Sequence, residues 1–423
     1  MKEQLINVVD VIRNAYQHVD SRLSNHGERV AYILMKMLED SPEFSPQDKQ
    51  DIFMLGLLHD VGAYKKEEID AMLSFDLGKT MEHSIFGYLL FQRFSPLPDY
   101  GDVILYHHNY NAQYYSVPID EYHRKLARFI HLADRIDIFC LSHKTEELPA
   151  FLYKNQHQLF SIDDILWFLQ SDETHHILDR LLSGAYKKDL TYYTSHSLLL
   201  SGEQLHDYLL MFIYSIDFRN SLTATHTSYA VHLSKKIAQM LRLTSTSCKI
   251  VELSALLHNI GKISLPSQLQ TMDDYDIYLK RLNEYATLEI THDILSEAVD
   301  TQILQIIDQS FQLIHCWANN SKVTFSPSPA VEIVSMSYLI SNAITLDSDI
   351  GANHCDELLP YLKEKYRLCG QDPSTLLAVE KHYSNILLET TAATETIQGI
   401  YRNMKNDNHS LNMILTHYNK KYL

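Results

Sequence analysis

An apolar helical run that ends in a histidine occurs twice in this chain, and no other feature constrains its fold as strongly. The run lies at residues 52–60, where it ends in His-Asp, and returns at 251–259, where it ends in His-Asn. A histidine also stands upstream of each run, at His26 and at His226. Because an unusual residue returns at matched spacing, the chain is predicted to be a diverged tandem repeat of two domain-sized copies.

The apolar residues of both runs follow a helical period. Ile52, Leu55 and His59 fall at positions i, i+3 and i+7, so this histidine is expected to face inward from an amphipathic helix. Only 12 of the 423 residues are glycine, fewer than half of the usual share, which disfavours glycine-rich phosphate loops and β-rich folds. The fold class is predicted to be all-α, with one domain over residues 1–200 and a second over 201–423.

Charge and cysteine usage exclude several classes of partner. A net charge of −17 would repel nucleic acid polymers and anionic membranes, whereas a small phosphorylated substrate remains compatible because bound cations can dominate the local field. The five cysteines are widely spaced without a CxxC pair, which favours a reducing cytoplasm. The first residues lack a secretory pattern, and no apolar run reaches the length of a membrane span.

Potential metal ligands are concentrated in the first half. Imidazoles and carboxylates are the donors that bind iron, manganese and zinc, and a carboxylate can bridge two such ions. A lone inward histidine is more often a hydrogen-bonded core residue, so only the whole set in its order indicates a metal site. The candidates are His26, His59, Asp60, His83, His107, His108 and Asp134.

This ordered set resembles the HD superfamily of metal-dependent phosphohydrolases, and more closely its HD-GYP branch of cyclic dinucleotide phosphodiesterases. The resemblance implies two tandem HD-domain helical bundles and a pair of divalent transition metal ions, iron or manganese first and zinc as an alternative. It implies that His26, His59, Asp60 and Asp134 hold one ion, and that Asp60, His83, His107 and His108 hold the second. Asp60 is then the bridging carboxylate and a catalytic residue.

Three basic residues are candidates for binding or catalysis at this site. The lysine that follows the dyad in the family is replaced by Ala63, and Lys65 and Lys66 are expected to substitute for it as catalytic and phosphate-binding groups. Arg128 is expected to contact the substrate, although it could simply pair with an acidic residue. The GYP loop of the branch is absent, and Asn109 follows the double histidine where the family has glutamate.

The second half retains fewer of these ligands. Asn259 replaces the bridging aspartate, Thr287 aligns with His83, and Tyr338 takes the place of Asp134. His315 is aligned with the first residue of the double histidine, followed by a cysteine. Without a bridging carboxylate, two adjacent cations would repel each other strongly. This half is therefore predicted to be non-catalytic and to serve packing, homodimerisation or regulation.

Three functions are compatible with the sequence. The first is a two-metal phosphodiesterase acting on a cyclic dinucleotide, similar to cyclic di-GMP, or on a related small phosphodiester. The second is an inactive signalling scaffold that binds a nucleotide or a protein. The third is a nucleotidase of the wider HD superfamily. The sequence alone does not separate the exact substrates of these enzymes.

Overall fold

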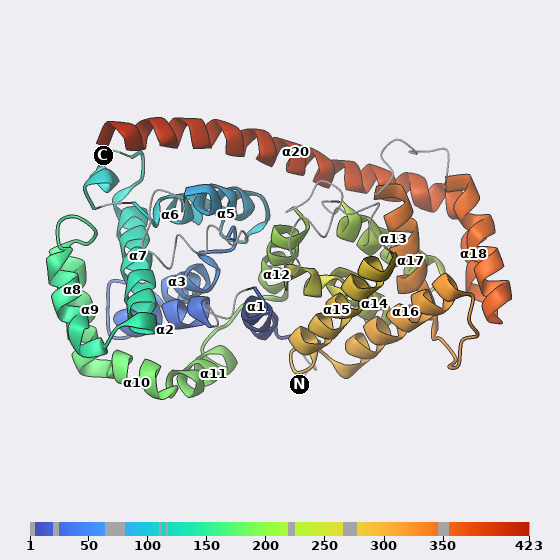
Figure 1. Cartoon of the computed structure of the whole chain (residues 1–423), viewed down its shortest axis with the longest axis horizontal. Coiled ribbons are helices and arrows are strands. Elements are labelled where there is room, and N and C mark those ends of the chain that lie inside the picture. Colours follow the sequence, from blue (N-terminus) through green and yellow to red (C-terminus); the bar gives the residue numbers. More distant parts are fainter. Residues whose placement is uncertain are drawn as a thin grey trace. The chain divides into compact units, whose positions relative to one another are not determined.

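The computed structural model describes residues 5–19, 25–63, 81–109, 111–115, 117–218, 225–264, 277–345 and 355–422. Within these ranges the chain forms α-helices and short 3-10 helices, and no strand of a sheet (Figure 1). The predicted all-α class is confirmed. None of the described helices combines the length and the apolar character that a bilayer span requires.

The chain divides into two compact units. The Asp60 unit comprises Ser21–Phe212 and Met404–Leu423, and the Asn259 unit comprises Met1–Asp20 and Ile213–Asn403. This division differs from the expected boundary after residue 200, because both ends of the chain pack with the half that is distant in sequence. The assignment of a separate function to each half stays a prediction.

In the described part of the Asp60 unit, nine α-helices lie wholly between residues 26 and 196. Their bounds are α2 (His26–Leu38), α3 (Pro46–Leu58), α5 (Met81–Phe94), α6 (Gly101–Tyr106), α7 (Glu121–Ser142), α8 (Leu148–Lys154), α9 (Ile162–His175), α10 (Ile177–Ser183) and α11 (Tyr186–His196). The 3-10 helices described between them are η3 (Pro98–Tyr100), η4 (Asn111–Tyr115) and η5 (Thr145–Glu147). The helix α12 (Gly202–Asp217) runs across the division into the Asn259 unit.

Helices α2, α3 and α7 form the core that carries the dyad. α3 begins at a capping box in which Ser45 accepts from the backbone of Asp48 and the Asp48 side chain accepts in return. α2 packs so closely on α3 that a Cβ at Gly27 would lie only 2.6 Å from the carbonyl oxygen of Leu57. This close approach brings the first residue of α2 next to the last turn of α3.

The Asn259 unit repeats this arrangement. Its helices are α1 (Val8–Gln17), α13 (His226–Met240), α14 (Ser245–Leu257), α15 (Ile277–Leu295), α16 (Thr301–Asn319), α17 (Pro329–Thr345), α18 (Cys355–Cys369) and α19 (Ser374–Glu380), with the 3-10 helix η6 (Ile260–Ser264) after the second dyad. The long helix α20 (Tyr383–Tyr422) contributes its first part here and its last part to the Asp60 unit. α13 packs on α14 and α17 as α2 packs on α3 and α7.

The first helix belongs to the Asn259 unit for a physical reason. Its apolar face, including Val8, Val11 and Ile12, is buried, and the backbone N–H of Asn7 donates to the carbonyl of Ala298 at 2.7 Å. α1 packs against α15. These contacts join segments almost 300 residues apart in sequence, so no local pattern could have predicted them.

Candidate metal centre

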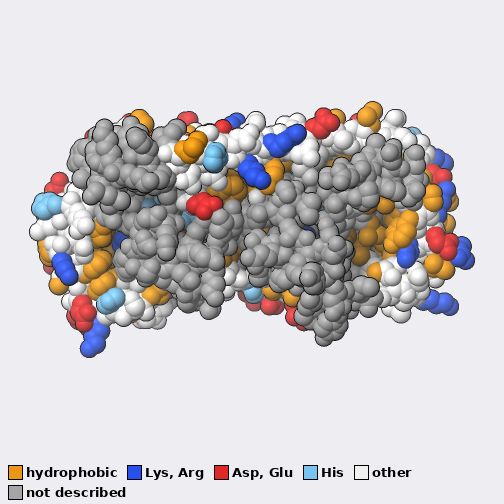
Figure 2. Space-filling view, turned by 45° about the horizontal axis from the view of Figure 1, so that its top comes forward, with side chains coloured by type: hydrophobic (Ala, Val, Ile, Leu, Met, Phe, Trp, Pro, Cys, Tyr) orange, Lys and Arg blue, Asp and Glu red, His pale blue; other side chains and the backbone are white. Residues whose placement is uncertain are grey.

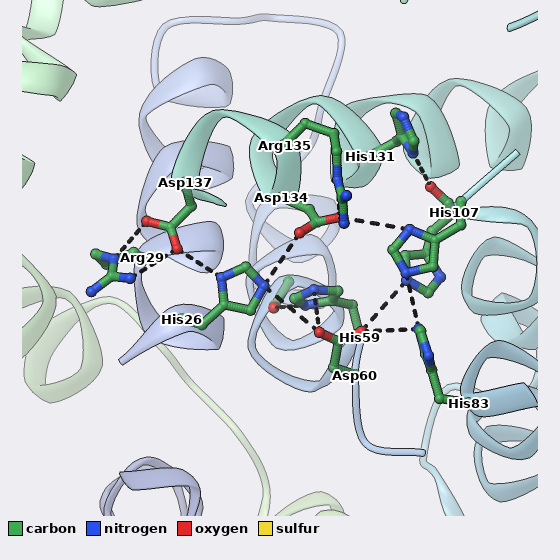
Figure 3. A network of polar contacts seen from close by, with 12 residues as sticks. His26, Arg29, His59, Asp60, His83, His107, His131, Asp134, Arg135 and Asp137 are labelled. Carbon is green, nitrogen blue, oxygen red and sulfur yellow. Dashed lines mark hydrogen bonds and ion pairs between the residues drawn. The ribbon is translucent and has the colours of Figure 1, made fainter. Parts of the chain in front are cut away.

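Six polar side chains from five segments of the Asp60 unit gather around Asp60 (Figure 3). His26 begins α2, His59 caps the end of α3, and His83 lies in the first turn of α5. The remaining members come from the end of α6 and the middle of α7: His107, His108 and Asp134. All seven residues predicted as metal ligands are thus brought together.

The two oxygens of Asp60 face different groups of imidazoles. Oδ1 lies 3.3 Å from Nε2 of His83 and 3.6 Å from Nε2 of His107. Oδ2 lies 3.2 Å from Nε2 of His59 and 3.7 Å from Nε2 of His26. Two sets of potential ligands, one with His26 and His59 and one with His83, His107 and His108, therefore share this carboxylate. The assignment of these residues to two metal ions stays a prediction.

Asp134 closes the first set from the side of α7. Its Oδ1 lies 3.3 Å from Nε2 of His26, and its Oδ2 lies 3.6 Å from Nδ1 of His108. Arg135 binds the same Oδ2 through Nη2 at 2.6 Å, and both residues of this pair are fully buried. The guanidinium thus occupies one oxygen of Asp134 and leaves Oδ1 directed at His26.

Backbone carbonyls orient two of the imidazoles. Nδ1 of His59 lies 2.8 Å from the carbonyl oxygen of Gly56, and Nδ1 of His107 lies 2.6 Å from that of Ile104. A carbonyl oxygen only accepts hydrogen bonds, so each Nδ1 carries the proton and each Nε2 keeps its lone pair. These lone pairs point towards Asp60, as required of metal ligands.

The chemistry of the donor set fits divalent cations. Among the described residues, several buried atoms at the centre have no hydrogen-bond partner, including Nε2 of His26, His59 and His107 and both oxygens of Asp60. Buried polar atoms are normally hydrogen-bonded, and clustered exceptions need an explanation. Ligand atoms around one small cation are separated by about 3 Å when each metal bond is near 2.1 Å, close to the spacings found here. Cations would satisfy these atoms together.

Electrostatics keeps the groups in the protonation states that bind metals. Burial would raise the pKa of Asp60, but the surrounding imidazoles, above all His59, hold it well below its usual range. Burial lowers the pKa of His83 to about 4 and that of His108 well below its ordinary value. His26 differs: burial would lower its pKa, yet Asp134 and Asp137 together raise it to about 10. Without cations, a proton on His26 would neutralise this acidic side of the centre.

The three predicted basic residues have different outcomes. Lys65 and Lys66 lie outside the described residues. Arg128 contacts Asp164 of α9, with Nε 2.8 Å from the carboxylate, and the Asp164 side chain is almost fully buried. The structure therefore engages Arg128 in the acidic pairing that the sequence left open, and its substrate contact stays a prediction.

Three supporting residues were not predicted from the sequence. Arg135 binds Asp134, Asp137 accepts from Nδ1 of His26 at 2.7 Å, and Nδ1 of His131 donates to the carbonyl of His107 at 2.7 Å. A signal for Asp137 was present, because it follows Asp134 by three positions on one helix and must share its face.

The corresponding centre of the Asn259 unit has a different composition. Nε2 of His226 lies 3.1 Å from Nε2 of His258, so this imidazole pair is retained. The ring of Tyr338 packs edge-on against both, at centroid distances of 5.4 and 5.3 Å. An aromatic ring thus lies beside the two imidazoles where the Asp60 unit has the carboxylate of Asp134. Within the described part of this unit, no three histidine, cysteine or acidic side chains gather as a metal site would require.

The structure supports two of the aligned pairs between the units. A Cβ at Gly62 would lie 2.2 Å from the carbonyl oxygen of His83, and one at Gly261 would lie 2.2 Å from that of Thr287, which supports pairing Thr287 with His83. This offset of 204 residues also relates Asp134 to Tyr338.

Extended along α16, the same offset pairs His107 with Phe311, whose ring lies 6.1 Å from that of Tyr338. His315 is exposed on α16 and hydrogen-bonds with Asn319. The alignment of His315 with the double histidine was wrong, because α16 continues as one long helix and carries this residue past the centre.

Comparison with known proteins identifies the fold of the first half. Residues 23–138 match the HD domain family, a range that contains all seven converging residues. The first half of the chain therefore contains an HD domain. The predicted resemblance to the HD superfamily is confirmed over this range, and the matched segment carries the centre described above.

Two proteins of Vibrio cholerae resemble this chain over longer ranges. The 3'3'-cGAMP-specific phosphodiesterase 1 is 26% identical over 268 residues, which cover 58% of this chain and 60% of that protein. The chain therefore matches less than two thirds of this relative's length. A crystal structure titled as a cyclic GMP-AMP-specific phosphodiesterase superposes with a TM-score of 0.54 at 16% identity, over 89% of this chain and 96% of that one. The second likeness concerns the fold alone.

Proposed function

We propose that this HD protein is a metal-dependent phosphodiesterase that hydrolyses a cyclic dinucleotide at the Asp60 centre. The observation that carries the proposal is the convergence of buried, unpartnered nitrogen and oxygen atoms on one shared carboxylate. The relative named for 3'3'-cGAMP supports the substrate class and makes that mixed cyclic dinucleotide the first substrate to test.

The residues of the centre would divide the metals as the family resemblance implies. His26, His59 and Asp134 would hold one ion and His83, His107 and His108 the other, with Asp60 shared. Bound divalent cations lower the pKa of water and stabilise charge on phosphoryl oxygens. Asp60 and Asp134 supply only two negative charges among these seven ligands, so the loaded centre would keep a positive balance that attracts a phosphodiester. A phosphate could thus bind despite the acidic surface of the whole chain.

The surface charge supports a small substrate over a nucleic acid polymer. Figure 2 shows basic and acidic side chains interspersed among the described residues of one face, instead of gathered by sign. Polymer binding normally depends on many lysines and arginines that together neutralise a run of phosphates. We propose Lys65 and Lys66 as the phosphate contacts beside the centre, and single alanine variants should raise the KM.

The Asn259 unit is proposed to be non-catalytic. Both carboxylates of the ligand set are replaced by Asn259 and Tyr338, and the tyrosine ring packs on the two retained imidazoles. A role in homodimerisation or regulation, and a cytoplasmic location, remain predictions of the sequence. Light scattering of the purified protein would test the dimer directly.

Hydrolysis of a substrate panel tests the proposed activity. Protein reconstituted with Mn²⁺ or Fe²⁺ is incubated with 3'3'-cGAMP, cyclic di-GMP, nucleoside triphosphates and an aryl phosphodiester, and products are separated by chromatography. We expect metal-dependent cleavage of a cyclic dinucleotide that is lost in Asp60→Asn and kept in Asn259→Ala.

Other outcomes would replace the proposal with one of the alternatives. Cleavage restricted to nucleoside phosphates would identify a nucleotidase. A protein that stays metal-free after reconstitution, and inactive on every substrate, would identify a scaffold. Loss of turnover in Asn259→Ala with normal turnover in Asp60→Asn would reverse the assignment of the two units.

A further inference from the structure

His26 differs from the other oriented imidazoles in its place on a helix. His59 and His107 lie at helix ends, where Nδ1 reaches a carbonyl three residues earlier. His26 is the first residue of α2 and has no preceding turn of its own helix. A group from another element must therefore hold its Nδ1.

Asp137 of α7 is the group that holds it. Its Oδ2 lies 2.7 Å from Nδ1 of His26, and the Asp137 side chain is almost completely buried. Arg29, one turn after His26 on α2, binds the same carboxylate through Nη2 at 3.0 Å and through Nε (Figure 3). Both oxygens of Asp137 are thus engaged, and the carboxylate is fixed between His26 and a guanidinium.

The opposite nitrogen of His26 faces the centre. Nε2 lies 3.3 Å from Oδ1 of Asp134 and 3.7 Å from Oδ2 of Asp60, with no hydrogen-bond partner among the described residues. A carboxylate on one ring nitrogen of a metal-binding histidine fixes the tautomer and makes the other nitrogen a stronger donor. The contact of Asp137 therefore has the geometry of support for a metal ligand.

The Asn259 unit provides an internal comparison. There, Ser341 occupies the position of Asp137, with its hydroxyl 3.0 Å from Nδ1 of His226. Tyr229 occupies the position of Arg29. The ring is still held, but by a neutral group, in the unit where Asn259 and Tyr338 replace the two carboxylates. The charged pair of Asp137 and Arg29 therefore occurs in the unit that has the full set of predicted metal ligands. The helix packing that both units share does not require this pair.

We propose that Asp137, held by Arg29, is a positioning residue that directs Nε2 of His26 at the cation shared with His59 and Asp134. The inference rests on the proposed function, because it assumes that the Asp60 centre holds metals. It predicts a selective effect: Asp137 supports only the ion bound by His26, and the ion bound by His83, His107 and His108 should not depend on it.

Titration with Co²⁺ alone tests the selectivity without any measurement of turnover. Affinities are measured by competition with a chromophoric chelator, and the cobalt absorption bands report the ligand geometry. Asp137→Ser, which copies the Asn259 unit, should weaken one of two Co²⁺ sites by about 10–100-fold and alter its bands, and leave the other unchanged. Asp137→Asn should act in the same direction and serves if the serine variant folds poorly.

Asp164→Ser is the matched control, because Asp164 is a buried carboxylate paired with an arginine of α7 but does not touch a metal-ligating residue. It should lower stability and leave both Co²⁺ affinities unchanged. Arg29→Gln should weaken the same site as Asp137→Ser, and the double variant should be no weaker than Asp137→Ser alone, since Arg29 acts through Asp137.

The outcomes separate this inference from the proposed function. Wild-type protein that binds no Co²⁺ would overturn both. Two Co²⁺ ions in the wild type with equal affinities in Asp137→Ser and Asp164→Ser would overturn the positioning role alone. Equal weakening of both sites in Asp137→Ser would show that Asp137 maintains the helix packing and not the aim of His26.

Discussion

Alanine at Gly62 should inactivate the metal centre by moving a helix. The added Cβ would lie 2.2 Å from the carbonyl oxygen of His83 and 2.7 Å from the backbone nitrogen of Gly87. Both neighbours are backbone atoms of α5, so no side-chain rotation can relieve the contact. Ordinary van der Waals separation is about 3.5 Å, and α5 must therefore retreat by about 1 Å.

The displaced residue is itself a predicted ligand. His83 lies in the first turn of α5, and its Nε2 is 3.3 Å from Asp60. A misplacement of about 1 Å can reduce the rate about 100-fold in an active site that depends on exact positioning. Overpacking of this kind also costs about 1–3 kcal/mol of unfolding free energy. We expect Gly62→Ala to show both losses together with a lower metal content.

The repeat offers a matched control at Gly261. A Cβ there would lie 2.2 Å from the carbonyl oxygen of Thr287 and 2.8 Å from the nitrogen of Thr291. Gly261→Ala should lose similar stability in urea unfolding but keep the metal content, measured by elemental analysis, and the turnover of an aryl phosphodiester. The reasoning is refuted if Gly62→Ala keeps normal metal content and turnover, or if Gly261→Ala lowers them equally.

Three further predictions concern stability and the second centre. Burial lowers the pKa of His258 to about 3 and raises that of Asp217 to about 7. The neutral His258 contributes stability above pH 6.5, and this contribution is lost as the pH falls towards 3. The protonated Asp217 acts in the opposite direction: it contributes stability below pH 3.8, and this contribution is lost as the pH rises through 7. Asp217→Asn removes the contribution that opposes the histidine. Thermal unfolding between pH 4 and 7 should therefore show a steeper loss of stability on acidification in this variant than in the wild type, and a flatter profile would contradict the assignment. Ser45→Ala should reduce the unfolding free energy by about 1 kcal/mol through loss of the α3 cap, measured in urea, with metal content unchanged. Asn259→Asp with Tyr338→Asp should raise the bound metal by one ion per chain, and Asn259→Asp alone should not.

The converging ligands could be predicted because their signal is local and ordered. His59 and Asp60 end a helix whose apolar period requires the histidine to face inward, and the double histidine also ends a helix. The family resemblance then supplied the partners from distant elements. Chemistry at these positions is dictated by residue type and spacing, which a sequence displays directly.

Other features depended on packing that spacing does not reveal. His315 keeps a ligand's residue type, but the uninterrupted helix α16 turns it outwards, and Phe311 lies nearer the centre. Arg128 has a suitable charge, yet a buried carboxylate of α9, distant in sequence, engages it. The docking of α1 on α15 likewise joins segments that are far apart in the sequence. Each outcome depends on a tertiary neighbour whose identity no local pattern specifies.

The contrast between the units explains why one centre would require cations and the other would not. Asp60 and Asp134 are buried carboxylates, and charges taken out of water are strongly destabilising unless other charges compensate them. In the Asn259 unit, the same positions hold Asn259 and Tyr338, and Ser341 replaces the supporting aspartate, so the charge that cations would balance is gone. Two neutral imidazoles packed on an aromatic ring carry no charge that a cation would need to balance. The helices of the two units are similar, so the proposed difference in function depends on the carboxylates.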